Sequence, residues 1–175
     1  MENIKWEIDP SHSVVQFKVK HLMISYLTGR FDEITGTVEA SHNFENAKFT
    51  FSANINSINT NNELRDTHLK SAEFFDAEKF PKLSFTSTSF TKTSDTEFEL
   101  NGNLTIKEVT KPLLLNVEYG GIATDPWGNI KAGFQLEGKI NRKDFGLIWN
   151  ETIEAGGTMV SEEVALIANI ELLKK

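Results

Sequence analysis

Residues 48–55 read KFTFSANI, and in this stretch apolar side chains alternate with polar ones. The apolar residues from Phe49 to Ile55 would all lie on one face of an extended chain, because successive side chains of a strand point to opposite sides. One apolar face and one polar face are typical of an antiparallel sheet that buries only one side. The segment therefore predicts a half-buried β-strand.

The same period-two alternation recurs on both sides of this stretch. The recurring apolar sets are Val15, Phe17 and Val19; Phe98, Leu100, Gly102 and Leu104; Leu113, Leu115, Val117 and Tyr119; Ala132, Phe134, Leu136, Gly138 and Ile140; and Val164, Leu166, Ala168, Ile170 and Leu172. The last set lies in a segment of helix-friendly composition, but its strict spacing of two predicts a closing strand.

Turn-forming residues separate these runs. The turn signals are Asp9-Pro10, Asn101-Gly102-Asn103, Gly120-Gly121, residues 125–129 (DPWGN) and Gly156-Gly157. Many short strands divided by turns, without a long linker, predict one all-β domain over residues 1–175, either a sandwich or a barrel. About eight strands would enclose an interior that is either filled by side chains or able to hold one small ligand.

Composition excludes several classes of function. The chain has 175 residues, a net charge of −7 and no cysteine. The negative charge opposes binding to nucleic acid, and the lack of cysteine removes thiolate chemistry and sulfur-ligated metals. No apolar run approaches the roughly 20 residues of a membrane-spanning helix, and residues 1–5 lack the apolar core of a signal peptide. We therefore expect a soluble, cytoplasmic protein.

An irregular insertion interrupts the strand pattern between residues 57 and 85, SINTNNELRDTHLKSAEFFDAEKFPKLSF. Asn61 or Asn62 can cap a short helix over residues 63–70, in which Leu64 and His68 share one face. A helix of two turns is not stable alone and must dock on the rest of the fold. The apolar surface for docking is predicted to come from Phe74, Phe75 and Phe80. At a barrel end this insertion would act as a cap, and along the side it would be only a crossover.

Several motifs closely resemble the YceI-like family, in the expected order and over nearly the whole chain. They are WEIDPSHSVVQFKVKHL from Trp6, GRF at residues 29–31, the insertion from Ser57, NGNLTIKEVTKPLLL from Asn101 and INRKDFGL from Ile140. The resemblance implies an extended, antiparallel, eight-stranded, lipocalin-like β-barrel with a short helical insertion. It also implies an apolar tunnel that binds polyisoprenoid lipids, in some members a quinone or a fatty amide, and it implies no catalytic residue.

The resemblance and the alternation together predict which residues contact such a lipid. The predicted tunnel-wall residues are Val15, Phe17, Val19, Phe31, Phe74, Phe75, Phe85, Leu104, Phe134, Phe145 and Trp149. The polar candidates at its mouth are His21, Arg65 and His68. Arg65 beside Asp66 also fits an ion-paired pin that holds the cap without touching a ligand, and Arg142 with Asp144 fits a turn clamp. Trp6 is expected to plug a barrel end, and Trp127 to fold over its own turn.

We expect a lipid as the ligand, with no other cofactor, no bound metal and no catalysis. We also expect transient contact with membranes. The sequence does not decide between a monomer and a homodimer. One alternative is an interaction module whose interior is filled by its own side chains. Another is a small metal or hydrolytic enzyme that uses His21 and His68. No HExxH, GxSxG or phosphate-loop motif supports an enzyme, and the nearest approach to a triad is Asp9, His12 and Ser13.

Overall fold

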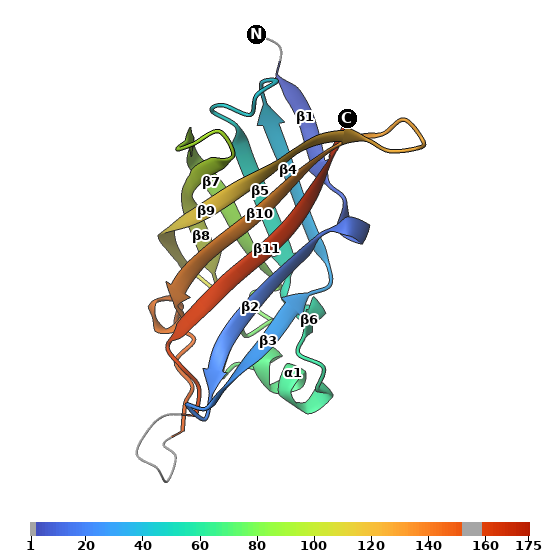
Figure 1. Ribbon diagram of the computed structural model, residues 1–175. Helices are drawn as coiled ribbons and strands as arrows, with labels where there is room; N and C mark the ends of the chain where they lie inside the picture. Colours follow the sequence, from blue (N-terminus) through green and yellow to red (C-terminus); the bar gives the residue numbers. More distant parts are fainter. Residues whose placement is uncertain (1–2, 152–158) are drawn as a thin grey trace.

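The computed structural model describes residues 3–151 and 159–175 (Figure 1). Their strands are β1 (Ile4–Ile8), β2 (Val14–His21), β3 (Ser25–Phe31), β4 (Ile34–Ala40), β5 (Lys48–Asn54), β6 (Ile58–Asn59), β7 (Lys82–Lys92), β8 (Glu97–Ile106), β9 (Val109–Thr124), β10 (Ile130–Asn141) and β11 (Glu163–Lys174). Their helices are α1 (Glu63–Lys70) and the 3₁₀ turns η1 (Pro10–His12), η2 (Ile55–Ser57) and η3 (Arg142–Phe145). The predicted turn at Gly156-Gly157 lies outside the described residues.

The sheet of the described residues closes on itself. Its neighbours run in the order β1, β4, β5, β7, β8, β9, β10 and β11, and β1 pairs with β11 as well as with β4. These eight strands form an antiparallel barrel, and the predicted fold class is confirmed. β11 also pairs with β2, so β1 and β2 follow one another along it. The β2–β3 hairpin thereby extends the wall at one end (Figure 1).

The predicted closing strand is β11, which pairs along its length with β10 and along parts of its length with β1 and β2. Two of the predicted turns are wrong, since Gly102 lies inside β8 and Gly120-Gly121 inside β9. At Gly102 a Cβ atom would lie 2.3 Å from the ring of Phe85, so the glycine makes room for a cross-strand aromatic side chain. Gly121 has a φ of +100° beside a register shift of β9 against β10, which is a β-bulge.

Aromatic side chains fill the end of the barrel at which β1 begins. Trp6 packs against Phe44 with ring centroids 5.2 Å apart, and Phe44 contacts Phe134 at 5.1 Å. Phe90 and Phe98 stack at 4.4 Å in the same group. Trp6 and Phe44 are fully buried, as expected for side chains that plug a barrel end. This end of the interior is therefore solid.

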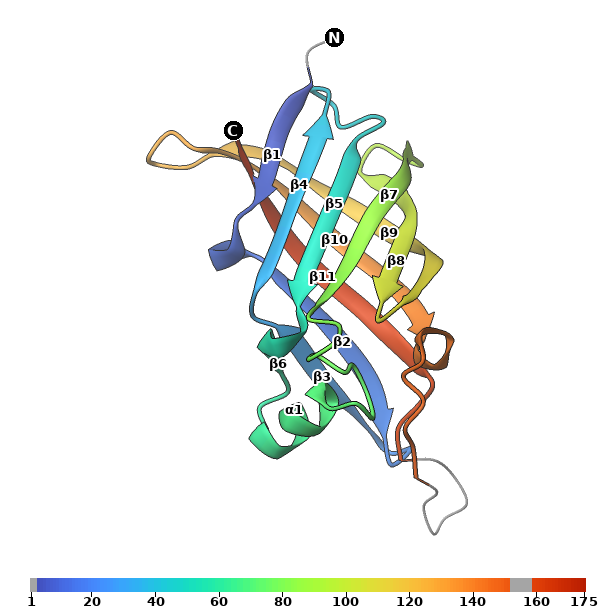
Figure 2. The same ribbon diagram turned by 180° about the vertical axis from the view of Figure 1, so that it is seen from behind.

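The insertion lies at the opposite end of the barrel, where α1 sits below β3 and β6 (Figure 2). Asn62 caps the helix, because its side-chain oxygen accepts a hydrogen bond from the backbone N–H of Arg65 at 3.1 Å. Of the residues predicted to dock the insertion, Phe74 is 6% exposed, Phe75 packs against the core and Phe80 is partly buried. On α1 itself Leu69 packs against the core, whereas Leu64 is 86% exposed. The position of the insertion fits a cap and not a lateral crossover.

Candidate functional site

The half of the barrel next to α1 is hollow. It encloses a cavity of about 320 Å³ whose walls are almost entirely apolar. The nominated residues that line it are Val15, Phe17, Val19, His21, Phe31, Arg65, His68, Phe74, Phe75, Phe85, Leu104, Phe134 and Trp149. Contact of these side chains with a ligand stays a prediction. Because the aromatic plug closes the far end, the interior is a blind cavity and not the tunnel that the resemblance implies.

Phe145 is the nominated residue that does not line the cavity. It is 3% exposed and belongs to the core at η3. Its assignment to the wall was wrong. The motif gives no side-chain direction, and the alternation that assigns faces along a strand does not continue into a 3₁₀ turn.

Other lining residues were not nominated. Phe51 and Leu83 come from β5 and β7, and alternation places Phe51 on the correct face. Leu147 and Met159 come from residues 146–151 and 159–162, the described parts of the chain between η3 and β11. No periodic signal could have found these two, because neither lies in a helix or strand.

Three rings from two distant segments meet at the α1 end of the cavity. The Trp149 ring lies 4.8 Å from the ring of His68 and 5.4 Å from that of Phe74, centroid to centroid. His68 and Phe74 themselves lie 5.1 Å apart, and the His68 Nε2 contacts a carboxylate oxygen of Glu73. Because all three rings line the cavity, this aromatic trio forms part of its mouth.

Removing the trio's indole should open the mouth. We expect Trp149→Ala to raise the dissociation rate of a bound isoprenoid about tenfold, because two ring pairs that hold the cap are lost. The measurement is the release rate of bound lipid after dilution. The control is Trp127→Ala, because Trp127 is 83% exposed and belongs to the β9–β10 connection, which lies at the end of the barrel opposite α1. Equal release rates for wild type and Trp149→Ala would contradict a gating role.

The exposure of Trp127, 83%, also shows that its ring does not fold over its own turn, contrary to expectation.

Arg65 lines the cavity but is held by the protein itself. Its Nε donates to the hydroxyl of Thr60 at 2.8 Å, and its Nη2 donates to the Thr60 carbonyl oxygen at 2.6 Å. Asp66 accepts a hydrogen bond from the backbone N–H of the same threonine at 2.9 Å. Arg65 and Asp66 therefore pin the cap through hydrogen bonds to Thr60, the residue that follows β6, as the alternative of a structural pin expects.

Arg142 fastens the segment that carries Trp149. Its guanidinium donates to the carbonyl oxygens of Leu147 (2.5 Å), Trp149 (2.9 Å), Val160 (3.2 Å) and Ser161 (2.8 Å). The side chain is 3% exposed, and burial lowers the pKa of Arg142 below its ordinary value. The predicted clamp is confirmed for Arg142, whereas Asp144 is exposed on the 3₁₀ turn. The clamp bridges both flanks of the segment between η3 and β11.

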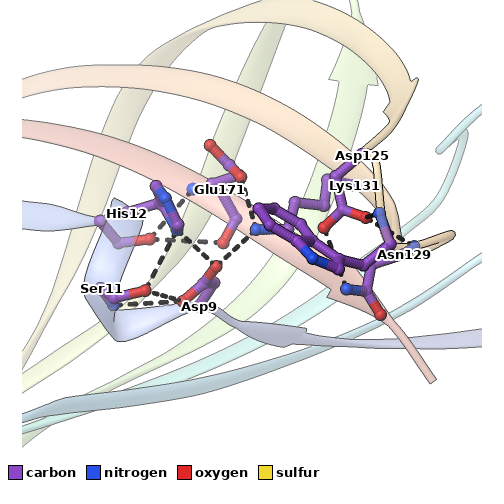
Figure 3. A network of polar contacts seen from close by, with 9 residues as sticks. Asp9, Ser11, His12, Asp125, Asn129, Lys131 and Glu171 are labelled. Atoms are coloured by element: carbon purple, nitrogen blue, oxygen red, sulfur yellow. Dashed lines mark hydrogen bonds and ion pairs between the residues drawn. The ribbon is translucent and has the colours of Figure 1, made fainter.

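A separate polar network fixes the break between β1 and β2 (Figure 3). The Lys131 Nζ lies 2.8 Å from a carboxylate oxygen of Asp9 and 3.0 Å from one of Glu171. His12 Nδ1 lies 2.8 Å from Asp9 and 3.1 Å from the hydroxyl of Ser11. These contacts tie η1 to β10 and β11 at the point where the chain passes from β1 to β2.

This network does not form a catalytic triad or a convincing metal centre. A triad needs the two different ring nitrogens of the histidine, whereas Nδ1 of His12 faces both Asp9 and Ser11. Ser13 instead accepts from the backbone N–H of Glu171. Among the described residues, the one group of three metal-type ligands is Asp9, His12 and Glu171. The ammonium of Lys131 already occupies the cation position between both carboxylates.

The network makes stability depend on pH in a defined direction. Lys131 holds the pKa of Asp9 well below its usual range, so the stabilisation from Asp9 is complete above about pH 3.9 and is lost as the pH falls further. Asp9, followed by Glu171, raises the pKa of Lys131, so that contribution is lost only above about pH 10.4.

Between about pH 4 and pH 2 we therefore expect Asp9→Asn to show a shallower fall in unfolding free energy than the wild type. Urea unfolding at several pH values measures this slope. Other acidic groups with lowered pKa values, such as Asp32, titrate in both proteins and cancel in the difference. Parallel curves for the two proteins would show that Asp9 is not linked to folding.

The model of the YceI-like domain matches residues 6–172. The chain belongs to the YceI-like family. Protein YceI of Salmonella newport (strain SL254) is 42% identical over 168 residues, which cover 95% of this chain and 84% of the relative.

Solved structures of YceI-like proteins share the barrel. The Campylobacter jejuni YCEI protein is 33% identical with a TM-score of 0.77, and the match covers 89% of this chain and 90% of that one. A domain from Saccharophagus degradans, described as polyisoprenoid binding and implicated in plant cell wall breakdown, matches with a TM-score of 0.68 at 15% identity, over 97% and 98% of the two chains. The second match shows the fold alone.

Proposed function

We propose that this YceI-like chain binds a long-chain isoprenoid lipid, a polyprenyl chain or the tail of an isoprenoid quinone, in the blind cavity. The observation that carries the proposal is the cavity itself, whose walls are almost entirely apolar and which is closed at one end by the aromatic plug. A volume of about 320 Å³ lies within the range of small-molecule sites. The polyisoprenoid-binding description of the Saccharophagus degradans domain supports the same class of ligand.

The proposed binding needs shape and dryness and no chemistry. Each methylene group that leaves water for the cavity contributes about 0.8 kcal/mol, so an isoprenoid tail supplies affinity without a polar contact. Selectivity would come from the length of the cavity and from the groups at its mouth. We place the polar head group beside His21, the last residue of β2, and His68 of α1, which both line the cavity. No cofactor is required beyond the bound lipid.

The alternative of a filled interior is favoured only at one end, where Trp6, Phe44 and their neighbours pack solidly. The enzyme alternative lacks a supporting constellation, since the residues around His12 form a structural network. The family and the matched structures described above are consistent with a binding protein.

The test is organic extraction of freshly purified, tag-free protein followed by mass spectrometry, with an unrelated protein purified in parallel. We expect near-stoichiometric isoprenoid or quinone in the extract. An empty extract, together with no thermal stabilisation on adding such lipids, would refute the proposal, because a ligand that binds only the folded state must raise its stability.

A further inference from the structure

We infer that the rim of the cavity mouth is a membrane-docking surface that enters a lipid bilayer, and this inference rests on the proposed lipid ligand. The rim consists of exposed apolar residues at the α1 end of the barrel: Leu22, Met23 and Ile24 in the β2–β3 turn, Leu64 on α1, and Ile148. Among the described residues, no helix is long and apolar enough to span a bilayer.

Each part of the rim adjoins a residue that lines the cavity. Leu22 follows His21 in the chain, Leu64 precedes Arg65, and Ile148 precedes Trp149. The backbone N–H of Leu22 also donates to the carbonyl oxygen of Met159, which is another lining residue, at 2.8 Å. The exposed apolar side chains thus come from three segments that also build the mouth, so a surface bound there would meet the cavity opening.

The backbone of the β2–β3 turn holds apolar side chains at a position that usually selects other residues. Leu22 and Met23 have φ values of 51° and 63°, and the Ile24 N–H donates to the His21 carbonyl oxygen at 3.1 Å. Consecutive left-handed residues in a hairpin turn favour Asn and Gly, which adopt this conformation at least cost. Here the turn carries Leu and Met, and the following Ile24 is 82% exposed. Local conformation and exposure to water both disfavour these residues, so we assign them to an apolar environment outside the protein.

The shape of the rim favours a bilayer as the occupant. A hairpin tip protrudes from the barrel and can enter a fluid apolar phase (Figure 1). The proposed cargo is insoluble in water and would be exchanged with a bilayer. The net charge of −7 opposes attraction to anionic lipids. We therefore expect docking that is driven by apolar insertion, does not need anionic lipid and persists at high salt.

Flotation with vesicles of phosphatidylcholine tests the inference. We expect the wild type to float with the vesicles and the double variant Met23→Ser/Ile24→Ser to lose about tenfold or more of the bound fraction. Trp127→Ser is the matched control, because Trp127 is as exposed as Ile24 but belongs to the β9–β10 connection, which lies at the opposite end of the barrel. Absence of wild-type flotation, or an equal loss in the control, would overturn the inference.

The depth of insertion can be read directly because the chain has no cysteine. An environment-sensitive fluorophore on Ile24→Cys should shift to the blue on adding vesicles, and the same dye on Trp127→Cys should not. If sedimentation shows a wild-type dimer that the Met23→Ser/Ile24→Ser variant abolishes, the rim is an interface between copies and the inference is wrong.

Binding of farnesol in vesicle-free buffer separates this inference from the proposed function. The Met23→Ser/Ile24→Ser variant should bind farnesol like the wild type, because neither residue lines the cavity. Normal farnesol binding without wild-type flotation would overturn docking alone. A delipidated wild type that binds neither farnesol nor a longer isoprenoid would overturn the proposed function, on which the inference rests.

Discussion

Ala168→Trp is expected to abolish lipid retention while the barrel stays folded. Ala168 lies in β11 and faces the cavity, and its register partners, Leu136 on β10 and Val15 on β2, line the cavity too. An indole at this position would occupy the space that the proposed tail fills. Because the change adds no charge to the interior, it avoids the large cost of burying an ion. The measurement is the lipid recovered by extraction of purified protein.

Ala165→Trp is the matched control for this substitution. Ala165 lies on the same strand, but it is three positions away and therefore on the opposite face, where its register partners are Lys18 and Lys139. It is not among the residues that line the cavity. We expect this variant to keep its lipid, with strand content by circular dichroism near normal in both variants. Full retention of lipid by Ala168→Trp would show that the cavity is not the binding site.

Arg142→Met should give the largest loss of stability among the substitutions considered. The methionine keeps the apolar bulk, but four carbonyl oxygens lose their donor, including those of Leu147 and Trp149. Hydrogen bonds from a charged group contribute about 1.5–3 kcal/mol each, and the carbonyls near water recover part of this. We expect the free energy of unfolding to fall by about 3 kcal/mol or more in urea titrations.

Hydrogen exchange should localise the same loss. In Arg142→Met we expect faster exchange of the amides in residues 147–151 and 159–161, which the guanidinium connects. The control is Lys143→Met, one position along the chain, where an exposed ion pair with Glu162 is removed and stability should hardly change. An unchanged urea midpoint for Arg142→Met would mean that the clamp does not hold the segment.

Local features of this chain were predictable because local residues decide them. Alternation along β5, β10 and β11 assigned the inward faces, since the side-chain period of a strand follows from backbone geometry alone. Asn62 before a charged helical turn marked the start of α1 for the same reason. Gly102 and Gly120-Gly121 misled the prediction of turns, because a glycine in a strand can also accommodate a neighbouring ring or a bulge.

The candidate site was predictable in its chemistry and only partly in its membership. Inward faces on strands and the resemblance to the YceI-like family led to most of the lining residues, such as Phe17 and Phe134. Phe145 was misplaced and Met159 was missed, because both lie where no strand period operates. The role of Arg65 was also decided by a neighbour, Thr60, whose hydroxyl and carbonyl groups both bind it.

The sequence by itself determined an all-β chain with an apolar inner face, a capped short helix and membership of the YceI-like family. Only the tertiary structure decided which half of the interior is solid and which is hollow. That depends on Phe44, from the β4–β5 connection, reaching Trp6 and Phe134, and on His68 and Trp149 meeting at the mouth. Such contacts join residues far apart in the chain, and their geometry follows from barrel closure and strand register, which no local pattern encodes.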